Sequence, residues 1–438
     1  MPNATFATAM ADTLLENVRI LDPHSGTDTV GHALVVAGVL QSFGTGRPAE
    51  LPAGVQRINA QGLWLTPGWV DIHTHFREPG FEWKEDIASA SRAAARGGIT
   101  AAVCMANTNP VNDTPPVTKT IIDRGREVGL IDLRPVGACT VGLKGEELAS
   151  LVQLAQAGCV AFSDDGHVIQ NGHVMRRVLE FARSLDLPVV VHAEDNLIRQ
   201  GGAMHEGAIS WQLGYRGNPR TAESVMVARD IELAALTGGH VHIQHVSTAD
   251  AVMHIRRAKE RGLPVTAEGC PHHFTLTDEA VLHYGTNAKM APPLREQRDV
   301  DAITAALVDG TFDCIATDHA PHAPHEKELP FEDAPFGILG FQTLVPLTLA
   351  LGARTGMPQL RLIDLVTRAA AALMRMPHGQ LTVGAPAEFT LIDPKAQWVL
   401  DASTNESKSR NSPWWGQSLT GKAVATAYNG RWSFSELQ

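Results

Sequence analysis

Paired cysteines, basic runs and long apolar stretches are all scarce in this sequence. The 438 residues include five cysteines, scattered and never spaced C-x-x-C, which argues against a disulfide framework or a cysteine-rich zinc site and fits a reducing cytosol. The formal net charge is −11 without a lysine or arginine run, so nucleic acid and anionic membranes are poor partners. No apolar run approaches the ~20 residues that span a bilayer, and the first 18 residues lack the Lys or Arg of a signal peptide. We therefore expect a soluble, cytoplasmic protein.

Histidine, by contrast, is abundant: the chain has 19 histidines in an otherwise ordinary globular composition, with 44% hydrophobic and 19% charged residues. Histidine is the commonest metal ligand, and it is the side chain that titrates near neutral pH. The positions of the histidines are therefore more informative than their number.

The order of apolar runs predicts the fold class, which is α/β. Eight short apolar runs alternate with amphipathic segments, as is typical of a closed (β/α)8 or TIM barrel. Short β-branched runs separated by Gly, Pro and Asp turns precede and follow this region. We expect the barrel at residues 67–375 and one small β-sandwich domain formed from both chain termini, residues 1–66 plus 376–438. The eight runs are GWVDIH, ITAAVCMAN, DLRPVGAC, GCVAFSDD, LPVVVHAED, HVHIQHVS, LPVTAEGC and FDCIATDHA.

Ligand-type residues end six of the eight runs. Chemistry in a TIM barrel gathers at the carboxyl ends of the strands, so these side chains should meet at one mouth. The spacing of His73 and His75 puts both imidazoles on one face of a strand, where they can hold one metal ion. Imidazole and carboxylate without thiolate suit Zn²⁺, with Mn²⁺ or Co²⁺ as substitutes. The other strand-end residues are Asn107, Asp164, Asp165, His192, His245, Asp318 and His322.

The remaining fourteen histidines are expected to have surface or structural roles, because a lone histidine is more often a satisfied core or surface residue than a ligand. Five of them lie near the predicted mouth, and their roles stay open at this point. These are His167, His173, His272, His273 and His325.

Together these motifs resemble the class I (bacterial) dihydroorotases of the amidohydrolase superfamily. The resemblance runs from about residue 60 to 430 and includes the closing NSPWWGQSLTGKAVATAYNGR. DIHTHFREPG is shared with allantoinases and more loosely with hydantoinases, whereas FSDDG with HAED and TDHAPH is more specific to dihydroorotases. The motifs are PGWVDIHTHFREPG, MANTNP, AFSDDG, VVHAEDN, HIQHVST, KMAPPLR and ATDHAPH.

The resemblance implies a metal site with one or two Zn²⁺ ions per subunit. His73 and His75 should bind the more buried ion with Asp318, and His192 and His245 should bind the second. Hydantoinases and allantoinases bridge two metals with a carboxylated lysine at the end of strand four. Here Ser163 stands at that position and residues 145–191 contain no lysine. In class I dihydroorotases an aspartate of F-S-D-D-G replaces the lysine, and Asp165 fits this role better than Asp164.

The resemblance also implies the reaction, the reversible cyclisation of N-carbamoyl-L-aspartate to L-dihydroorotate plus water in pyrimidine (UMP) biosynthesis. Asp318 should be the general acid and base. Arg77 should grip the substrate carboxylate because its planar fork suits bidentate binding. Asn107 and His322 should help it, and a loop at Pro335, Phe336 and Gly337 should contact the pyrimidine ring.

Two residues depart from the family pattern. Ala291 stands where relatives often carry Asn, and Gln342 stands where Glu is usual. Neither touches the predicted metal ligands. The stretch 326–336 is a candidate lid over the mouth.

Two alternative functions stay open. One is an allantoinase- or hydantoinase-type cyclic amidase. The other is an inactive scaffold that partners aspartate transcarbamoylase, which would be expected to have lost metal ligands. The family pattern also implies a homodimer, and association with aspartate transcarbamoylase is compatible with catalysis.

Overall fold

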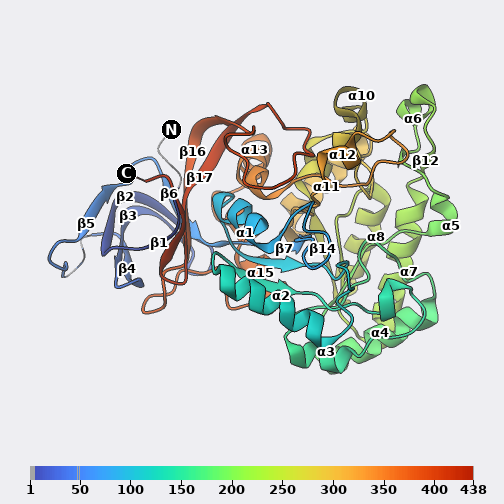
Figure 1. Cartoon of the computed structure of the whole chain (residues 1–438), viewed down its shortest axis with the longest axis horizontal. Helices are drawn as coiled ribbons and strands as arrows, with labels where there is room; N and C mark the ends of the chain where they lie inside the picture. The colour runs from blue at the N-terminus through green and yellow to red at the C-terminus, as the bar shows by residue number, and fades with distance from the viewer. Residues whose placement is uncertain (1–4, 47, 49, 438) are drawn as a thin grey trace.

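The protein consists of a curled β-sheet next to a barrel wrapped in helices (Figure 1). A computed structural model describes residues 5–46, 48 and 50–437. The prediction of an α/β fold, with a TIM barrel and a small β domain drawn from both termini, is confirmed. The domain boundaries at 66/67 and 375/376 stay a prediction. In the described residues no helix is both long and apolar enough to cross a membrane.

Strands from both ends of the chain form one nine-stranded sheet. Their order is β1-β18-β17-β16-β6-β2-β3-β4, and β5 pairs with β2. The two ends of the chain meet where β6 pairs antiparallel with β16, with Thr66 opposite Thr390. The strands enclose one apolar core that includes Leu15, Val35 and Phe389. The bounds are β1 Thr5–Ala9, β2 Thr13–Asp22, β3 Thr27–Val36, β4 Val39–Gly44, β5 Gln56–Asn59, β6 Trp64–Pro67, β16 Phe389–Val399, β17 Ser418–Tyr428 and β18 Arg431–Ser435.

The barrel consists of seven parallel strands, and isolated bridges complete the ring between them. β7, β8 and β9 form one sheet, and β10, β13, β14 and β15 form another. The fourth strand position is held by Phe162, which bridges Gly137 on one side and Val189 on the other. A bridge between Thr74 and His319 closes the ring. The bounds are β7 Trp69–Thr74, β8 Ile99–Cys104, β9 Asp132–Pro135, β10 Val189–Val191, β13 Val241–Ile243, β14 Val265–Gly269 and β15 Cys314–Ile315.

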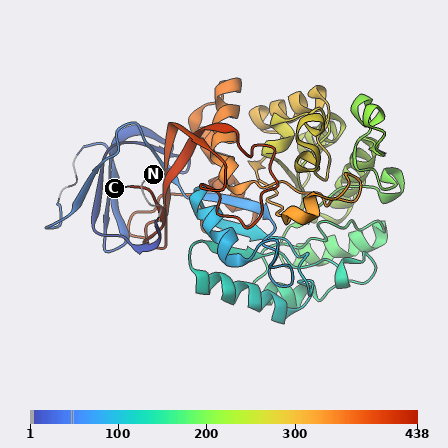
Figure 2. The same cartoon turned by 45° about the horizontal axis from the view of Figure 1, so that its top comes forward.

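Helices follow the strand positions and cover the outside of the ring (Figure 2). Their ends carry local signals: the Asp86 carboxylate accepts a hydrogen bond from the Ser89 N–H at 2.7 Å and starts α1, and Gly129 ends α2 with a left-handed φ of 66°. The principal helices are α1 Ile87–Arg96, α2 Pro115–Val128, α3 Leu151–Ala157, α4 Gly172–Ser184, α7 Thr221–Thr237, α8 Ala249–Glu260, α11 Gln297–Asp309, α13 Leu344–Thr355, α14 Gln359–Asp364 and α15 Arg368–Leu373.

Shorter elements fill the connections between them. These are η1 Val141–Leu143, α5 Asn196–Arg199, β11 Met204–His205, α6 Ala208–Leu213, β12 Gly217–Asn218, α9 Pro271–Thr275, α10 Ala280–Tyr284, η2 Gly285–Ala288, α12 Pro324–Lys327 and η3 Phe341–Thr343.

The inside of the barrel is a packed apolar plug. Val70, Val103, Val190 and Cys314 come from four different strands of the ring and belong to one buried cluster. Side chains in this position fill a TIM barrel and leave its mouth for chemistry. All five cysteines are free, in agreement with the prediction of no disulfide framework, and all are buried: Cys104, Cys139, Cys159, Cys270 and Cys314.

A partly buried histidine joins the barrel to the sheet. His378 Nδ1 lies 2.8 Å from Glu388 Oε1, just before β16, and Nε2 lies 2.8 Å from Asp132 Oδ2 on β9. Burial lowers the pKa of His378, but the two carboxylates outweigh it and raise the pKa to about 9. Asp132 and Glu388 therefore hold a charged imidazole between the two parts of the chain.

We expect His378 to make stability depend on pH. Its folded-state pKa lies above its ordinary value of 6.5, so its contribution is fully present below about pH 6.5 and is lost as pH rises through about 9. Over this window the wild type should lose up to about 3 kcal/mol more unfolding free energy than His378→Gln. Urea unfolding at pH 6, 7.5 and 9.5 measures this. The exposed His283→Gln should behave as wild type, and parallel pH curves for wild type and His378→Gln would contradict the assignment.

Candidate active site

A cavity of about 1200 Å³ opens at the carboxyl ends of the barrel strands. Most of the predicted site residues line it, although they lie up to 261 positions apart in the chain (75 to 336). His73 is fully buried and does not line the cavity. The lining includes His75, Arg77, Asn107, Asp165, His192, His245, Ala291, Asp318, His322, Pro335 and Phe336.

The Asp165 carboxylate lies at the centre of four histidines. Its Oδ1 is 3.6 Å from His73 Nε2, 3.6 Å from His192 Nδ1 and 3.7 Å from His245 Nε2. Its Oδ2 is 3.5 Å from His75 Nε2. One carboxylate therefore reaches both the H-x-H pair and the two later histidines, as a bridging ligand must.

Asp318 completes the cluster from the end of the eighth strand. Its Oδ1 lies 3.5 Å from His73 Nε2 and 3.0 Å from His75 Nε2. Three overlapping groups of ligand atoms result, each within 4.8 Å: His73, His75 and Asp165; His73, His245 and Asp318; Asp165, His192 and His245.

These residues fit a divalent cation. Three polar atoms of the cluster are buried without a hydrogen-bond partner: His73 Nε2, His245 Nε2 and Asp165 Oδ1. Leaving such atoms unpaired costs about 1–3 kcal/mol each, so a shared cation is a strong reason for the arrangement. Ligands at about 2.0–2.2 Å around a tetrahedral ion lie about 3.4 Å apart, which matches the spacing observed here. The nitrogen and carboxylate donor set suits zinc.

The electrostatics of the cluster also favour a cation. Burial opposes ionisation of Asp165, but the nearby imidazoles of His192, His245 and His73 hold its pKa well below its ordinary value. Burial likewise opposes charge on His192, whose pKa is nevertheless raised to about 9 by Asp165 and Glu194. The carboxylates are therefore ionised at neutral pH and attract positive charge.

The two aspartates of the D-D pair have different roles. Asp164 Oδ1 accepts a hydrogen bond from the Thr140 N–H at 3.0 Å, and its Oδ2 accepts from the Thr140 hydroxyl. Asp164 thus fixes a loop, while Asp165 faces the histidines. Ser163 donates its hydroxyl to Val190 O at 2.7 Å and accepts from the Asp165 N–H at 2.9 Å. The serine therefore fixes the backbone at Asp165.

Sequence reasoning missed the groups that orient the ligands. Glu268 Oε1 lies 2.6 Å from His73 Nδ1 and accepts the His245 N–H at 3.0 Å, while Oε2 lies 3.0 Å from His242 Nε2. Glu194 Oε2 lies 3.8 Å from His192 Nε2. Such partners fix the ring orientation of ligating histidines. Their signal was in the strand ends, V-T-A-E-G and V-H-A-E-D, which each carry a carboxylate.

The sequence predicts Asn107 as a substrate contact. In the structure its side chain also bonds to His75, one of the predicted metal ligands. Its Oδ1 lies 3.0 Å from His75 Nδ1, and its Nδ2 donates to Asp165 O at 3.4 Å. The amide therefore orients His75 while it lines the cavity.

Strained backbone marks three cavity residues. Arg77, His245 and Asp318 have φ values of 64°, 31° and 48°, in a region that residues with a Cβ rarely adopt. Such conformations persist where the surrounding structure enforces them, which is common at functional sites.

Arg77 gives the cavity a cationic wall. Its Nε donates to Pro321 O at 3.1 Å, and its Nη2 lies 3.3 Å from His322 Nε2. Burial lowers its pKa to about 10, so it is charged at neutral pH. Lys84, which sequence reasoning missed, lies 3.3 Å from His322 Nδ1 and 2.9 Å from Glu326 Oε1. Burial and these cations hold the pKa of His322 well below its ordinary value, so His322 is neutral.

The five histidines left open by the sequence separate into two kinds. His167 is exposed and lines the cavity, while His173 and His325 are exposed on the surface. His272 and His273 are buried on α9.

Sequence comparisons agree with this geometry. A family model described as "Dihydro-orotase-like" matches residues 62–251. A dihydroorotase of Pelobacter propionicus is 49% identical over 418 residues, 95% of this chain and 98% of the relative. One of Syntrophotalea carbinolica is 47% identical over the same shares. The chain belongs to the dihydroorotase family. The sequence resemblance is thereby confirmed.

Solved structures share the fold of this dihydroorotase family member. An L-hydantoinase from Arthrobacter aurescens superposes with a TM-score of 0.86 at 24% identity, over 98% of this chain and 97% of that one. A dihydropyrimidinase from Brevibacillus agri superposes with a TM-score of 0.81 at 23% identity, over 96% and 94%. At this identity the likeness establishes the barrel and its sheet.

The two departures from the dihydroorotase pattern lie in different places. Ala291 lines the cavity, whereas Gln342 is outside it. Gln342 Nε2 donates to Thr404 O at 2.8 Å, and its Oε1 accepts the Glu406 N–H at 2.9 Å. The neutral amide of Gln342 is both donor and acceptor there, which an ionised carboxylate could not be. These two bonds explain why glutamine is present at this position, outside the cavity.

Pro335 and Phe336 line the cavity, but Gly337 is held behind them. The Gly337 N–H donates to Lys289 O at 2.9 Å, and its carbonyl accepts from Asn411 Nδ2 at 2.9 Å. A Cβ at this glycine would come within 2.7 Å of His322 Cδ2, so glycine is needed for the close packing. Its contact with substrate stays a prediction.

We expect Glu268→Gln to weaken metal binding. The amide keeps the size of the side chain but cannot accept from both His73 and His242 as the carboxylate does, so His73 loses part of its support. Zn²⁺ affinity should fall about 10–100-fold, as measured by competition with a fluorescent chelator. The exposed Glu260→Gln serves as control. Wild-type affinity in a folded Glu268→Gln protein would contradict this role.

Proposed function

We propose that this member of the family is an active dihydroorotase, which interconverts N-carbamoyl-L-aspartate and L-dihydroorotate in pyrimidine biosynthesis. The observation that carries the proposal is a partly buried arginine, Arg77, in the same cavity as a cluster of histidines around Asp165. A fixed cation selects a carboxylated ring, and the cluster provides the means to act on its amide. The dihydroorotases of Pelobacter propionicus and Syntrophotalea carbinolica, similar over nearly their full length, support it.

The proposed metal ligands are His73, His75, Asp165, His192, His245 and Asp318, holding one or two Zn²⁺ ions. A divalent cation at this position supplies Lewis acidity, which polarises an amide carbonyl and makes water more acidic. Asp165 is the proposed bridging ligand if two ions bind. Glu268, Glu194 and Asn107 orient the histidines from behind.

Arg77 is the proposed anchor of the substrate carboxylate. Its guanidinium is already fixed by Pro321 O, which lowers the entropic cost of orienting the substrate. Asn107 and neutral His322 stand beside it as further contacts. Pro335, Phe336 and Gly337 are the proposed contacts for the pyrimidine ring.

Asp318 is the proposed general acid and base. In hydrolysis, water adds to the ring carbonyl carbon, the carbon–nitrogen bond breaks, and Asp318 carries the proton of the water to the leaving nitrogen. In cyclisation the same carboxylate takes the proton from the attacking ureido nitrogen as the carbon–nitrogen bond forms. The carbon–oxygen bond then breaks, and the oxygen leaves as water with that proton and one proton from solvent. His75 Nε2, 3.0 Å from Asp318 Oδ1, fixes the position of that oxygen.

The alternatives are less consistent with the chain. The sequence resemblance implies that allantoinases and hydantoinases bridge their metals with a lysine. In this chain that position is Ser163, which supports Asp165. An inactive scaffold for aspartate transcarbamoylase has no reason to keep all six ligands converging on one point.

We expect the purified protein to hydrolyse L-dihydroorotate, and to turn over allantoin and dihydrouracil at least about 100-fold more slowly, because those rings lack the carboxylate that Arg77 binds. An ultraviolet assay of dihydroorotate hydrolysis, run before and after chelation and with Zn²⁺ restored, tests this. Turnover of allantoin but not dihydroorotate would assign the chain to the cyclic amidases. No activity after Zn²⁺ reconstitution would favour the scaffold.

We expect Arg77→Met to impair substrate binding and spare the metal. Removing a charge-assisted pair should raise KM for dihydroorotate roughly 10–100-fold, because such bonds contribute about 1.5–3 kcal/mol. Steady-state kinetics and metal analysis of the same preparation measure both effects. The exposed Arg126→Met is the matched control, and an unchanged KM in Arg77→Met would refute the anchor.

We further propose that the enzyme is cytoplasmic and homodimeric, and that aspartate transcarbamoylase is a candidate partner. Light scattering of the purified chain, alone and mixed with that enzyme, distinguishes these states.

A further inference from the structure

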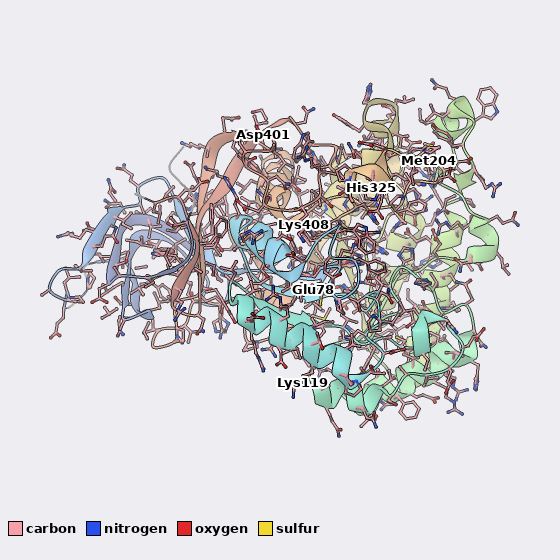
Figure 3. The ribbon with its side chains drawn as sticks, viewed as in Figure 1. Glu78, Lys119, Met204, His325, Asp401 and Lys408 are labelled. Atoms are coloured by element: carbon pink, nitrogen blue, oxygen red, sulfur yellow. The ribbon has the colours of Figure 1, made fainter. Side chains whose placement is uncertain are left out.

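The outer wall of the cavity is a short segment that follows α12. It spans residues 328–337 and carries Pro335 and Phe336. His325, labelled on α12 in Figure 3, marks where the chain enters it. The segment has no helix or strand of its own, so its backbone groups must find partners elsewhere.

Lys289 supplies three of those partners from behind the wall. Its side chain is 1% exposed, and its Nζ donates to Phe331 O at 2.6 Å, Glu332 O at 3.0 Å and Ala334 O at 2.6 Å. The same Nζ lies 4.4 Å from the centre of the Phe336 ring, a favourable cation–π contact. One ammonium thus binds the backbone of the segment and the side chain that faces the cavity.

Lys327 holds the next part of the segment. It is 6% exposed, and its Nζ donates to Pro335 O at 2.8 Å and Gly337 O at 3.2 Å. Together the two lysines bind five carbonyls within residues 331–337. Among the described residues, neither ammonium has a carboxylate within 4.0 Å.

Burying two lysines without carboxylate partners is unfavourable. Burial lowers the pKa of Lys289 to about 8 and that of Lys327 to about 7. An ammonium has three N–H donors and an amine two. The three carbonyls around Lys289 therefore require its charged form, whereas the two around Lys327 are served by either form. Apolar side chains of similar length would fill this space without the cost of charge. They would leave four of the five carbonyls without a donor among the described residues, since only Gly337 O keeps another one, Asn411 Nδ2.

We propose that Lys289 and Lys327 are positioning residues that fix the Pro335–Phe336 wall of the substrate cavity by binding its backbone carbonyls. The segment is then a fixed wall at 331–337, not the moving lid that the sequence left open for 326–336. This inference rests on the proposed function only for the identity of the substrate, dihydroorotate. The lysines do not touch the reacting atoms and act through the wall.

The test compares Lys289→Met and Lys327→Met with wild type. Because the lysines act on the wall of the cavity and lie outside its lining, KM for dihydroorotate should rise about tenfold while kcat changes less than about threefold. Lys289→Gln and Lys327→Gln keep N–H donors and should restore part of the lost affinity. Metal content should equal that of wild type in all four variants. Lys119→Met, exposed on the outer face of α2 (Figure 3), is the control.

Hydrogen–deuterium exchange gives a second readout that needs no activity. Amides of residues 328–337 should exchange faster in the Met variants, and those of β13 and β14 should not change. If a Met variant does not fold, its Gln variant carries both measurements. Unchanged KM and unchanged exchange at 328–337 would overturn the proposal, and so would a lower melting temperature with unchanged KM. If the wild type is inactive on dihydroorotate but exchange at residues 328–337 is faster in the variants, the proposed function is refuted. The role of the two lysines in fixing the wall is then still supported.

Discussion

The Asp165 carboxylate, shared by four histidines, is the interaction on which the rest of the site depends. It reaches His73 and His75 from the first strand, His192 from the fifth and His245 from the sixth. Only a closed ring can bring the ends of these strands to one point. The barrel therefore serves the site directly: any loosening of the ring would separate ligands that one carboxylate has to touch.

Burying several charged groups in a small volume is unfavourable. Hydrogen bonds from the residues around the cluster offset this cost. Glu268 holds His73 and His242, and it also accepts from the backbone of His245. Burial raises the pKa of a carboxyl, but the charges of His73 and His242 lower that of Glu268 to about 2. The remaining unpaired atoms, His73 Nε2, His245 Nε2 and Asp165 Oδ1, lie together in the cluster, as a cation site requires.

Most of the site could be predicted because its residues come in local patterns. H-x-H, F-S-D-D-G, H-A-E-D and D-H-A-P-H each place a reactive side chain at the end of an apolar run, and the rule for barrel strands brings such ends together. The eight runs, the surrounding helices and the sheet from both termini were likewise read from periodicity and turns. The bond between Asn107 and His75 was not, because an amide near a mouth gives no sign that it will bond a neighbouring histidine as well as line the cavity.

The sequence by itself determined the fold class and the histidines and aspartates at the strand ends, since these follow from local composition and spacing, and the family resemblance favoured Asp165 over Asp164. Only the tertiary structure decided that Glu268 and Glu194 support the histidines, and that Lys289 and Lys327 bind the carbonyls of the cavity wall. The reason is physical: each of these depends on the direction of a side chain across a contact between distant segments. Lys289 and Phe331 are 42 positions apart, and His73 and Glu268 are 195 apart. No local pattern encodes such a meeting.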